Sequence, residues 1–254
     1  MNPNKTESFV LSSLLENLKL PMFKKHYESF AKDATQQQYP YPQYLKNLAQ
    51  EELIYREQRR IKNLITRAKF PYHKNLTEFK FEQIPSLSKP KVMSLSPDEY
   101  IPKAGNLCFL GQTGTGKTHL SIALGLEACK KGYSVLFFTA AHLVNLLLEA
   151  RSEQRLIKLQ QRMSKIQLLI VDELGYIPFS KDASELLFQL FADRYEKKSM
   201  IITSNLEFSK WTQFLGDPTM TSALLDRLTH HAEIFTLNGE SFRFKQRKEE
   251  NKEK

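Results

Sequence analysis

A glycine-rich stretch at residues 111–118 (GQTGTGKT) constrains the fold of this chain more than any other feature. It follows an apolar run at 107–110 and opens a helical pattern, which is the strand, turn and helix context that a phosphate-binding loop requires. Glycines there allow successive backbone N–H groups to converge on a phosphate at a helix N-terminus. The sequence therefore predicts a nucleotide-binding loop made by Gly111, Gln112, Thr113, Gly114, Thr115, Gly116, Lys117 and Thr118.

The residues around this loop predict phosphoryl chemistry with a bound magnesium ion. Lys117 would neutralise the β- and γ-phosphate oxygens, and the Thr118 hydroxyl would hold Mg²⁺. A second apolar run, 168–171, ends in Asp172 and Glu173. We expect Asp172 to hold the metal ion through water, and Glu173 to orient and deprotonate the attacking water. Because a kinase must keep water out, a carboxylate at position 173 favours a hydrolase.

Polar residues further along the chain extend the predicted site. Asn205 follows the apolar run at 200–203, and an uncharged amide at this strand end can hydrogen-bond the γ-phosphate or the lytic water. Arg227 lies in a helical segment, and Arg243 follows the last expected strand. An arginine that reaches the γ-phosphate of a neighbouring subunit would complete that neighbour's site, whereas a surface ion pair is the alternative for each.

Short apolar runs that alternate with helical stretches predict an α/β fold with a five-stranded parallel sheet covered on both faces by helices. Phosphate chemistry in such a fold is expected at the carboxyl ends of the strands. The expected strands span 107–110, 135–139, 168–171, 200–203 and 234–237.

The residues before the sheet predict a small all-α domain and a linker. A longer helix is expected from about 44 to 69, after an extended stop at 39–42 (YPYP). Prolines between 71 and 102 indicate a linker with one short helix, in which Phe79 and Phe81 either cover an adenine ring or anchor the linker to the core. The expected division is a helical domain for partner or DNA contacts at 1–70, a linker at 71–103, a nucleotide-binding domain at 104–245 and a charged tail at 246–254.

The charge of the chain favours a polyanionic partner, because its 254 residues carry a formal charge of +9 and the pI is near 9.4. One helix between the second and third strands is expected to show a basic stripe beside an apolar stripe, which favours contact with a nucleic-acid backbone over a solvated face. For the basic half of the helix that ends near residue 69, both interpretations fit equally. The candidate DNA-binding residues are Arg151, Arg155, Lys158, Arg162, Lys165, Arg59 and Arg60.

Cysteine and histidine usage predicts neither a disulfide framework nor a metal-ligand set. Cys108 and Cys129 fall on the first strand and first helix of the nucleotide fold and are expected as small core residues. His230 and His231 are adjacent, so we expect them to point in different directions on the polar surface. The N-terminus lacks a signal-peptide pattern, and no apolar run is long enough to span a bilayer. These features favour a soluble, cytoplasmic protein without a membrane partner.

Taken together, these residues resemble the AAA+ ATPases and, among them, the IstB-like transposition helper proteins, which are close relatives of the DnaC-type helicase loaders. The resemblance covers nearly the whole chain, and the run from 225 to 243 is its most family-specific part. The matching segments are KFP at 69–71, the phosphate loop through Leu120, LIVDELGY at 169–176, LDRLTH at 225–230, Phe235 and NGESFR at 238–243.

The resemblance implies a P-loop AAA+ fold with ATP and Mg²⁺ as cofactors. It places Asn205 at the sensor-1 position, Arg227 at the arginine finger and Arg243 at a sensor-2-like position. The basic helix at 151–165 corresponds to the DNA-contacting helices of initiator-type members. About ten residues follow Arg243, which leaves no room for a C-terminal lid domain.

The resemblance also implies ATP-dependent oligomerisation on duplex DNA as a spiral or ring. The assembly would bend the DNA and deliver it to the transposase of the same mobile element, with ATP hydrolysis driving disassembly.

Several alternatives stay open from the sequence. A replicative helicase loader would share the ATPase core and differ in what the N-terminal domain grips. A GTPase fits the Asp-x-x-Gly pattern at 172–175, although an Asn-Lys-x-Asp guanine motif is absent from the sequence. A small-molecule kinase fits less well because of Glu173. A degenerate ATPase site in a structural DNA-binding protein is the last alternative.

Overall fold

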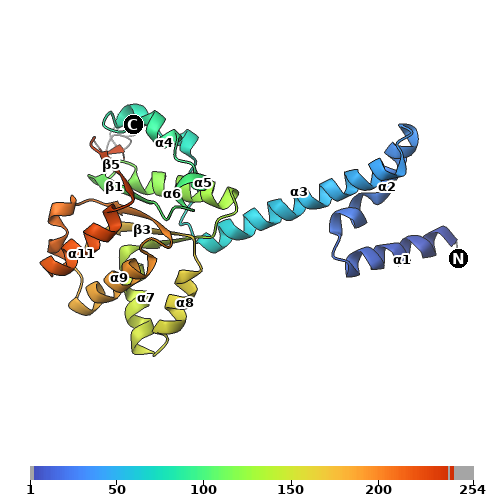
Figure 1. The fold of residues 1–254 in the computed structure, drawn as a ribbon. Coiled ribbons are helices and arrows are strands. Elements are labelled where there is room, and N and C mark those ends of the chain that lie inside the picture. Colours follow the sequence, from blue (N-terminus) through green and yellow to red (C-terminus); the bar gives the residue numbers. More distant parts are fainter. Residues whose placement is uncertain (1–2, 240, 243–254) are drawn as a thin grey trace, which may run out of the picture. The chain divides into compact units, whose positions relative to one another are not determined.

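The computed structural model of the chain describes residues 3–239 and 241–242, with side chains from residue 7 onward. It divides into two compact units, residues 1–63 and 64–254, which are described separately here (Figure 1). Among the described helices, none combines the length and apolarity that a bilayer-spanning segment requires.

The first unit is helical, as predicted. It contains α1 (Pro3–Asn17), α2 (Pro21–Gln36) and most of α3 (Tyr41–Ala68), within which the unit boundary falls. The extended segment predicted at 39–42 is wrong for its last two residues, because α3 begins at Tyr41 and includes Pro42 in its first turn. A proline is tolerated there, since the first N–H groups of a helix have no partner within the helix.

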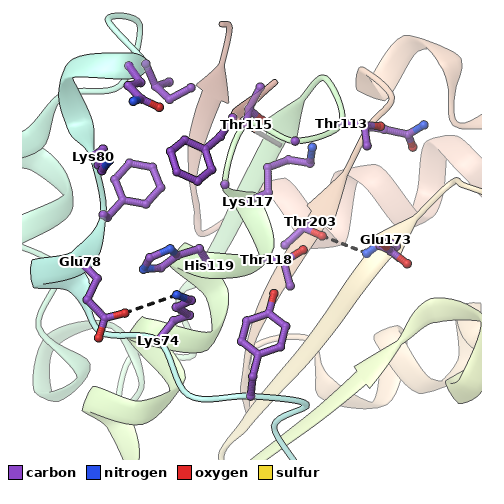
Figure 2. Close-up of a pocket in the computed structure, with 18 of the residues that line it drawn as sticks. Lys74, Glu78, Lys80, Thr113, Thr115, Lys117, Thr118, His119, Glu173 and Thr203 are labelled. Atoms are coloured by element: carbon purple, nitrogen blue, oxygen red, sulfur yellow. Dashed lines mark hydrogen bonds and ion pairs between the residues drawn. The ribbon is translucent and has the colours of Figure 1, made fainter. Parts of the chain in front are cut away.

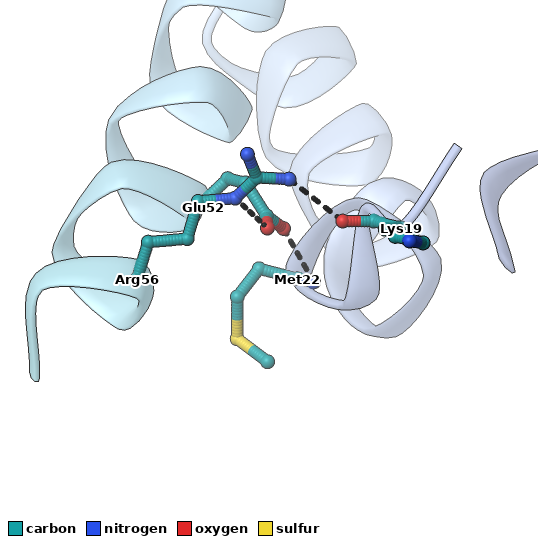
Figure 3. Close-up of polar contacts among 4 residues, drawn as sticks. All are labelled: Lys19, Met22, Glu52 and Arg56. Atoms are coloured by element: carbon teal, nitrogen blue, oxygen red, sulfur yellow. Dashed lines mark hydrogen bonds and ion pairs between the residues drawn. The ribbon is translucent and has the colours of Figure 1, made fainter. Parts of the chain in front are cut away.

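A buried carboxylate joins the helices of the first unit (Figure 3). Glu52 on α3 is 4% exposed and accepts hydrogen bonds from the Met22 backbone N–H at 2.9 Å and from Arg56 Nε at 2.8 Å. Arg56 Nη2 also donates to the Lys19 carbonyl at 2.7 Å. Because Met22 lies in the first turn of α2, Glu52 satisfies an N–H group that the helix leaves unpaired.

The second unit contains the predicted five-stranded parallel sheet. Its strands are β1 (Asn106–Gly111), β2 (Val135–Thr139), β3 (Leu168–Leu174), β4 (Ser199–Ser204) and β5 (Ala232–Leu237). Their order is β2-β3-β4-β1-β5, and every neighbouring pair is parallel. All five predicted strands are therefore confirmed. The bounds of β2 are as predicted, and the other four strands extend their predicted runs by a few residues.

Helices cover both faces of this sheet, which also confirms the prediction. Alternate residues of β1 enter different cores: Phe109 packs on the face covered by α6 (Lys117–Lys130), and Cys108 packs on the other face. Cys108 and Cys129 are both buried free cysteines. The second face is covered by α7 (Ala140–Ser152), α8 (Leu156–Ser164), α9 (Lys181–Arg194), α10 (Thr212–Leu215) and α11 (Pro218–Thr229), with η3 (Phe208–Lys210) between β4 and α10.

The segment before β1 is more structured than its prolines suggested. It contains four short helical elements where one was predicted: η1 (Leu76–Glu78), η2 (Phe81–Gln83), α4 (Lys89–Met93) and α5 (Pro97–Tyr100). The prediction failed because Pro90 and Pro97 stand in the first turns of α4 and α5, where proline favours a helix start. Phe79, Phe81 and Ile84 are buried in the core on the α6 face.

Candidate nucleotide site at the carboxyl edge of the sheet

The loop between β1 and α6 has the backbone geometry of a phosphate cradle. Its glycines Gly111, Gly114 and Gly116 have φ values of 142°, 83° and 90°, which are accessible to glycine and strained for other residues. A Cβ at Gly111 would lie 2.2 Å from the Leu237 carbonyl oxygen, and one at Gly116 would lie 2.6 Å from the Phe79 ring. Backbone conformation and close packing therefore both require glycine in this loop.

Lys117 lies at the start of α6 with its side chain folded onto the loop. Its Nζ donates to the carbonyl oxygens of Gly111 and Gln112, both at 2.7 Å. Thr115 Oγ1 donates to the same Gln112 carbonyl at 2.8 Å. The ammonium group thus lies at the mouth of the loop, where phosphate oxygens can replace the carbonyl oxygens as acceptors.

Asp172 is the buried acidic centre of the site and is 3% exposed. Thr118 Oγ1 lies 3.0 Å from both of its carboxylate oxygens, and Thr203 Oγ1 donates to Oδ1 at 2.6 Å. Burial raises the pKa of Asp172 above its ordinary value, while hydrogen bonds from Thr203 and Thr118 act in the opposite direction. This set of hard oxygen ligands fits a magnesium ion, which prefers carboxylate and hydroxyl oxygen.

Glu173 follows in a strained backbone conformation. Its φ is 60°, and the pairing of β3 with β4 shifts register between Val171 and Leu174. The Glu173 N–H donates to Thr203 Oγ1 at 2.9 Å (Figure 2). Because the same hydroxyl donates to Asp172, it links the two neighbouring acidic residues. The bulge turns the exposed Glu173 side chain to the cavity while Asp172 stays buried.

Asn205 lies just beyond the end of β4 and lines the same cavity. Its Oδ1 is buried and has no hydrogen-bond partner among the described residues. A buried acceptor without a partner is costly, and it indicates that a donor such as water or ligand belongs beside it.

Most of these residues line a cavity of about 480 Å³, within the usual range for ligand pockets. Asp172 does not line it and instead contacts two residues that do, Thr118 and Thr203. The cavity walls come from the loop, from Glu173, Thr203 and Asn205, and from the segment between Tyr72 and Ile84 (Figure 2). The remaining lining residues, which the sequence analysis did not identify, include Tyr72, Lys74, Glu78, Lys80, Gln83, His119, Tyr176 and Phe242.

The two aromatic residues proposed to cover an adenine ring lie differently. Phe79 lines the cavity and packs edge-on against His119, with ring centroids 5.4 Å apart. The Phe81 ring packs against the Phe79 ring, with centroids 4.8 Å apart, and is buried in the core. Phe81 therefore anchors this segment to the core, whereas Phe79 is part of both the core and the cavity wall.

The chain beyond β5 returns to the phosphate loop. The Phe242 N–H donates to the Gly114 carbonyl at 3.0 Å, and Ser241 lies so close to Gly114 that a Cβ there would be 2.1 Å from Ser241 Oγ. Lys80 Nζ lies 5.4 Å from the centre of the Phe242 ring. Arg243, the predicted sensor-2-like residue, lies outside the described residues.

Arg227 is absent from the walls of the described cavity. It lies on α11, where Nη1 donates to the Ala223 carbonyl at 2.8 Å and the guanidinium lies 5.3 Å from the Phe188 ring centre. Its own chain therefore does not bring Arg227 to the cavity that the other predicted residues form.

The predicted continuous basic helix is wrong, because the chain turns between α7 and α8. Gln154 has a φ of 55°, and the Arg155 N–H donates to the Ala150 carbonyl at 2.7 Å, which ends α7. The predicted basic residues are nonetheless all exposed. Leu156, Leu159 and Met163 of α8 pack toward the core, whereas Ile157 is exposed. Arg151 pairs with Asp182 at 3.5 Å, and Arg155 pairs with Glu153.

Arg59 and Arg60, the other DNA-binding candidates, are exposed on α3 in the first unit. Arg60 pairs with Glu57 at 3.4 Å, as a solvated helix face often does.

Comparison with known proteins assigns this architecture to a family. The family described as IstB-like ATP binding protein matches residues 13–250. The chain is 37% identical over 238 residues to the insertion sequence IS5376 ATP-binding protein of Geobacillus stearothermophilus, covering 93% of this chain and 95% of the relative. It is 36% identical over 238 residues to the insertion sequence IS21 ATP-binding protein of Pseudomonas aeruginosa, covering 94% and 90%.

Solved structures show the same fold at lower identity. AMPPCP-bound DnaA from Aquifex aeolicus superposes with a TM-score of 0.57 at 21% identity, covering 73% of this chain and 57% of that one. The structure of DnaI gives a TM-score of 0.55 at 17% identity, covering 70% and 94%. The sequence match and the fold agree, and the chain belongs to the family of IstB-like ATP-binding proteins, with a P-loop AAA+ fold.

Proposed function

We propose that this protein hydrolyses ATP and, in its ATP-bound state, assembles on duplex DNA and presents that DNA to the transposase of the same mobile element. Supporting this are relatives that are ATP-binding proteins of insertion sequences, and exposed basic residues on both units. The observation that carries the ATPase part is the cavity lined by the phosphate loop and the exposed Glu173, whose wall residues Thr118 and Thr203 hydrogen-bond the buried Asp172 carboxylate. We also propose that the protein acts in the cytoplasm.

Binding of ATP follows from the loop. Lys117 exchanges its two carbonyl acceptors for β- and γ-phosphate oxygens, and the loop N–H groups surround the β-phosphate. Thr118 and Asp172, which now contact each other, would hold a magnesium ion, with Asp172 acting through water. When bound, Mg²⁺ neutralises negative charge that develops on the phosphate oxygens.

Hydrolysis follows from Glu173 and Asn205. Water attacks the γ-phosphorus, the bond from that phosphorus to the bridging oxygen of ADP breaks, and the proton of the water passes to the Glu173 carboxylate. The partnerless Oδ1 of Asn205 accepts a hydrogen bond from the same water and fixes its orientation.

The position of Arg227 supports an assembly of several copies. Because it does not line the cavity of its own chain, we propose that it reaches the γ-phosphate of a neighbouring copy and stabilises charge in the transition state. A ring places every cavity beside such a neighbour, and a spiral does so for all but the terminal copy. The sensor-2-like role of Arg243 stays part of this proposal.

The contact with DNA is proposed for both exposed basic surfaces. Lys158, Arg162, Lys165 and Arg59 form no ion pair within the described part of the chain, so they are the stronger phosphate-binding candidates. Arg151, Arg155 and Arg60 complete the proposed surfaces.

The test measures particle size and duplex-DNA binding of the wild type, Lys117→Ala and Glu173→Gln, with and without ATP. We expect ATP to drive assembly on DNA for the wild type and for Glu173→Gln, whose assemblies persist because they do not hydrolyse ATP. Lys117→Ala should not respond to ATP. Assembly that ignores both ATP and Lys117 would contradict the proposal, and capture of a replicative helicase in place of the transposase would favour a helicase loader.

A further inference from the structure

A second group of chemically active side chains lies at the amino ends of the strands, on the sheet edge opposite the phosphate loop. Glu196 stands in the turn between α9 and β4, and His230 and His231 connect α11 to β5. His230 Nδ1 and His231 Nε2 each lie 3.7 Å from the same oxygen, Glu196 Oε1. The two imidazole centroids are 4.1 Å apart.

This arrangement overturns the expectation that adjacent histidines diverge. That expectation holds within a regular helix or strand, but α11 ends at Thr229 and β5 begins at Ala232, so the two residues occupy the turn between them. The change of backbone direction lets both rings approach one carboxylate.

We propose that Glu196, His230 and His231 bind a divalent transition-metal ion of the Zn²⁺ type. Their three ligand atoms all lie within 4.8 Å of one another. Zinc bonds to nitrogen and oxygen ligands at about 2.0–2.2 Å, so tetrahedral ligands stand roughly 3.4 Å apart. The two 3.7 Å separations need to shorten by only a few tenths of an ångström. Two imidazoles select such an ion over Mg²⁺, and the exposed fourth position remains for water.

The backbone beneath this site is fixed before any ion binds. Asn106, buried at the start of β1, donates through Nδ2 to the Leu228 carbonyl at 3.0 Å and accepts from the Met200 N–H at 2.9 Å. Its own N–H donates to the His231 carbonyl at 2.8 Å. One buried side chain thus ties together the end of α11 and the start of β4, which lowers the cost of ordering ligands from different elements.

The left-handed conformation of Glu196 follows from its place after a helix. Its φ is 56°, and it stands two residues after the end of α9. Lys19, Gln38 and Gln154 have similar φ values at the same distance from the ends of α1, α2 and α7, so this turn is a common way to end a helix. Here the turn brings the Glu196 carboxylate beside the two histidines.

Tyr195 determines how the proposed site can be tested. Its hydroxyl lies 2.8 Å from His230 Nδ1, the same atom that the ion would use. Metal binding must displace this hydrogen bond, so Tyr195→Phe removes a competitor. A mere hydrogen-bonded cluster gives no reason for that variant to bind metal as well as or better than the wild type.

The experiment titrates the full chain, without nucleotide or Mg²⁺ and freed of metal by a chelator, with ZnCl₂ in a calorimeter. We expect saturable binding of one ion per chain. His231→Ala and Glu196→Gln should each weaken it by at least about tenfold, since even an outer-shell change costs roughly 10- to 100-fold. Tyr195→Phe should bind with equal or higher affinity. Co²⁺ should give the visible absorption of a tetrahedral site in the wild type and in Tyr195→Phe, and this absorption should be lost in His231→Ala and Glu196→Gln.

His142→Ala is the matched control, because His142 is exposed on α7 and packs edge-on against Phe138. It should leave Zn²⁺ binding unchanged. Glu196→Gln keeps the size of the side chain, and equal melting temperatures without metal would verify that the variants fold. Absence of saturable binding, or equal binding in His231→Ala and Glu196→Gln, would overturn the proposal. ATP turnover is measured separately, so failure here leaves the proposed function intact.

Discussion

The cavity around Asp172 and the outer surface that carries Arg227 and α8 differ in how far the chain itself satisfies their polar groups. Asp172 receives hydrogen bonds from Thr118 and Thr203, and Lys117 is held by two carbonyl groups. Arg227 has one backbone acceptor and an aromatic neighbour, and it does not line the cavity. One chain thus holds the charged groups around Asp172 by itself, whereas the role proposed for Arg227 requires a second copy.

The largest effect is expected from replacing Arg227 on the outer surface. Arg227→Ala should lower ATP turnover of the DNA-bound assembly by about 10³-fold or more, the range found for arginine fingers, while nucleotide binding by single chains stays unchanged. Mixing Arg227→Ala with Lys117→Ala should restore part of the turnover, because the second variant lends its arginine to an intact cavity. Turnover assays at several mixing ratios check this. If Arg227 acted within its own chain, mixing would restore nothing.

The next effect tests the cavity through Thr203, which donates to Asp172 and accepts from the Glu173 N–H. Thr203→Val keeps the shape and removes both hydrogen bonds, so kcat should fall by about 10- to 100-fold, as expected for bonds to charged groups. The KM for ATP should change little, because the loop is untouched. Thr203→Ser should recover most of kcat. An equal loss in both variants would contradict this prediction, because Thr203→Ser keeps the hydroxyl and loses only the methyl group.

A smaller effect is expected from the charges on α8. In Lys158→Ala with Arg162→Ala, each lost phosphate contact should lower the slope of log affinity against log salt by about 0.9 for duplex DNA. Fluorescence anisotropy at several salt concentrations measures that slope. Lys210→Ala, an exposed lysine on η3, is the control. If the double variant kept the wild-type slope, α8 would not contact the DNA, and the contact would be assigned to Arg59 and Arg60.

The sequence predicted those parts of the molecule that depend on local pattern. The phosphate loop, the five strands and the carboxylates after β3 are each encoded by a short run of residues, so periodicity and residue type were sufficient. Asn205 was placed correctly at a strand end beside the cavity for the same reason.

Other features were missed because they depend on contacts between distant segments. Phe242 contacts the loop because the chain returns to it from β5, and Thr203 contacts Asp172 because β4 pairs with β3. The turn after α7 rests on a left-handed conformation at Gln154, a residue that carries no strong turn signal. Glu196 and His230 likewise meet only in the folded protein.

The smallest effect concerns the stability of the nucleotide-free protein. Burial raises the pKa of Asp172 above its ordinary value of 3.8, so the stability linked to this group is complete below that pH and declines as the pH rises through the folded-state pKa. At pH 7.5 the charged carboxylate therefore destabilises the fold. Asp172→Asn keeps an acceptor for Thr118 and Thr203 without the charge. Its free energy of unfolding should be about 1 kcal/mol higher than that of the wild type, which raises Tm by roughly 2–4 °C.

Thermal denaturation at pH 7.5 and near pH 4 measures this effect. The gain should shrink toward pH 4, where the wild-type carboxyl group takes up a proton. Adding ATP with Mg²⁺ should reverse the order, because the wild type gains stability from ligand binding and Asp172→Asn loses a metal-binding group. Glu207→Gln, which neutralises an exposed carboxylate, should change Tm little. A lower Tm for Asp172→Asn at pH 7.5 without nucleotide would mean that the charge itself holds the cavity together, and the contrast with the outer surface would then rest on Lys117 alone.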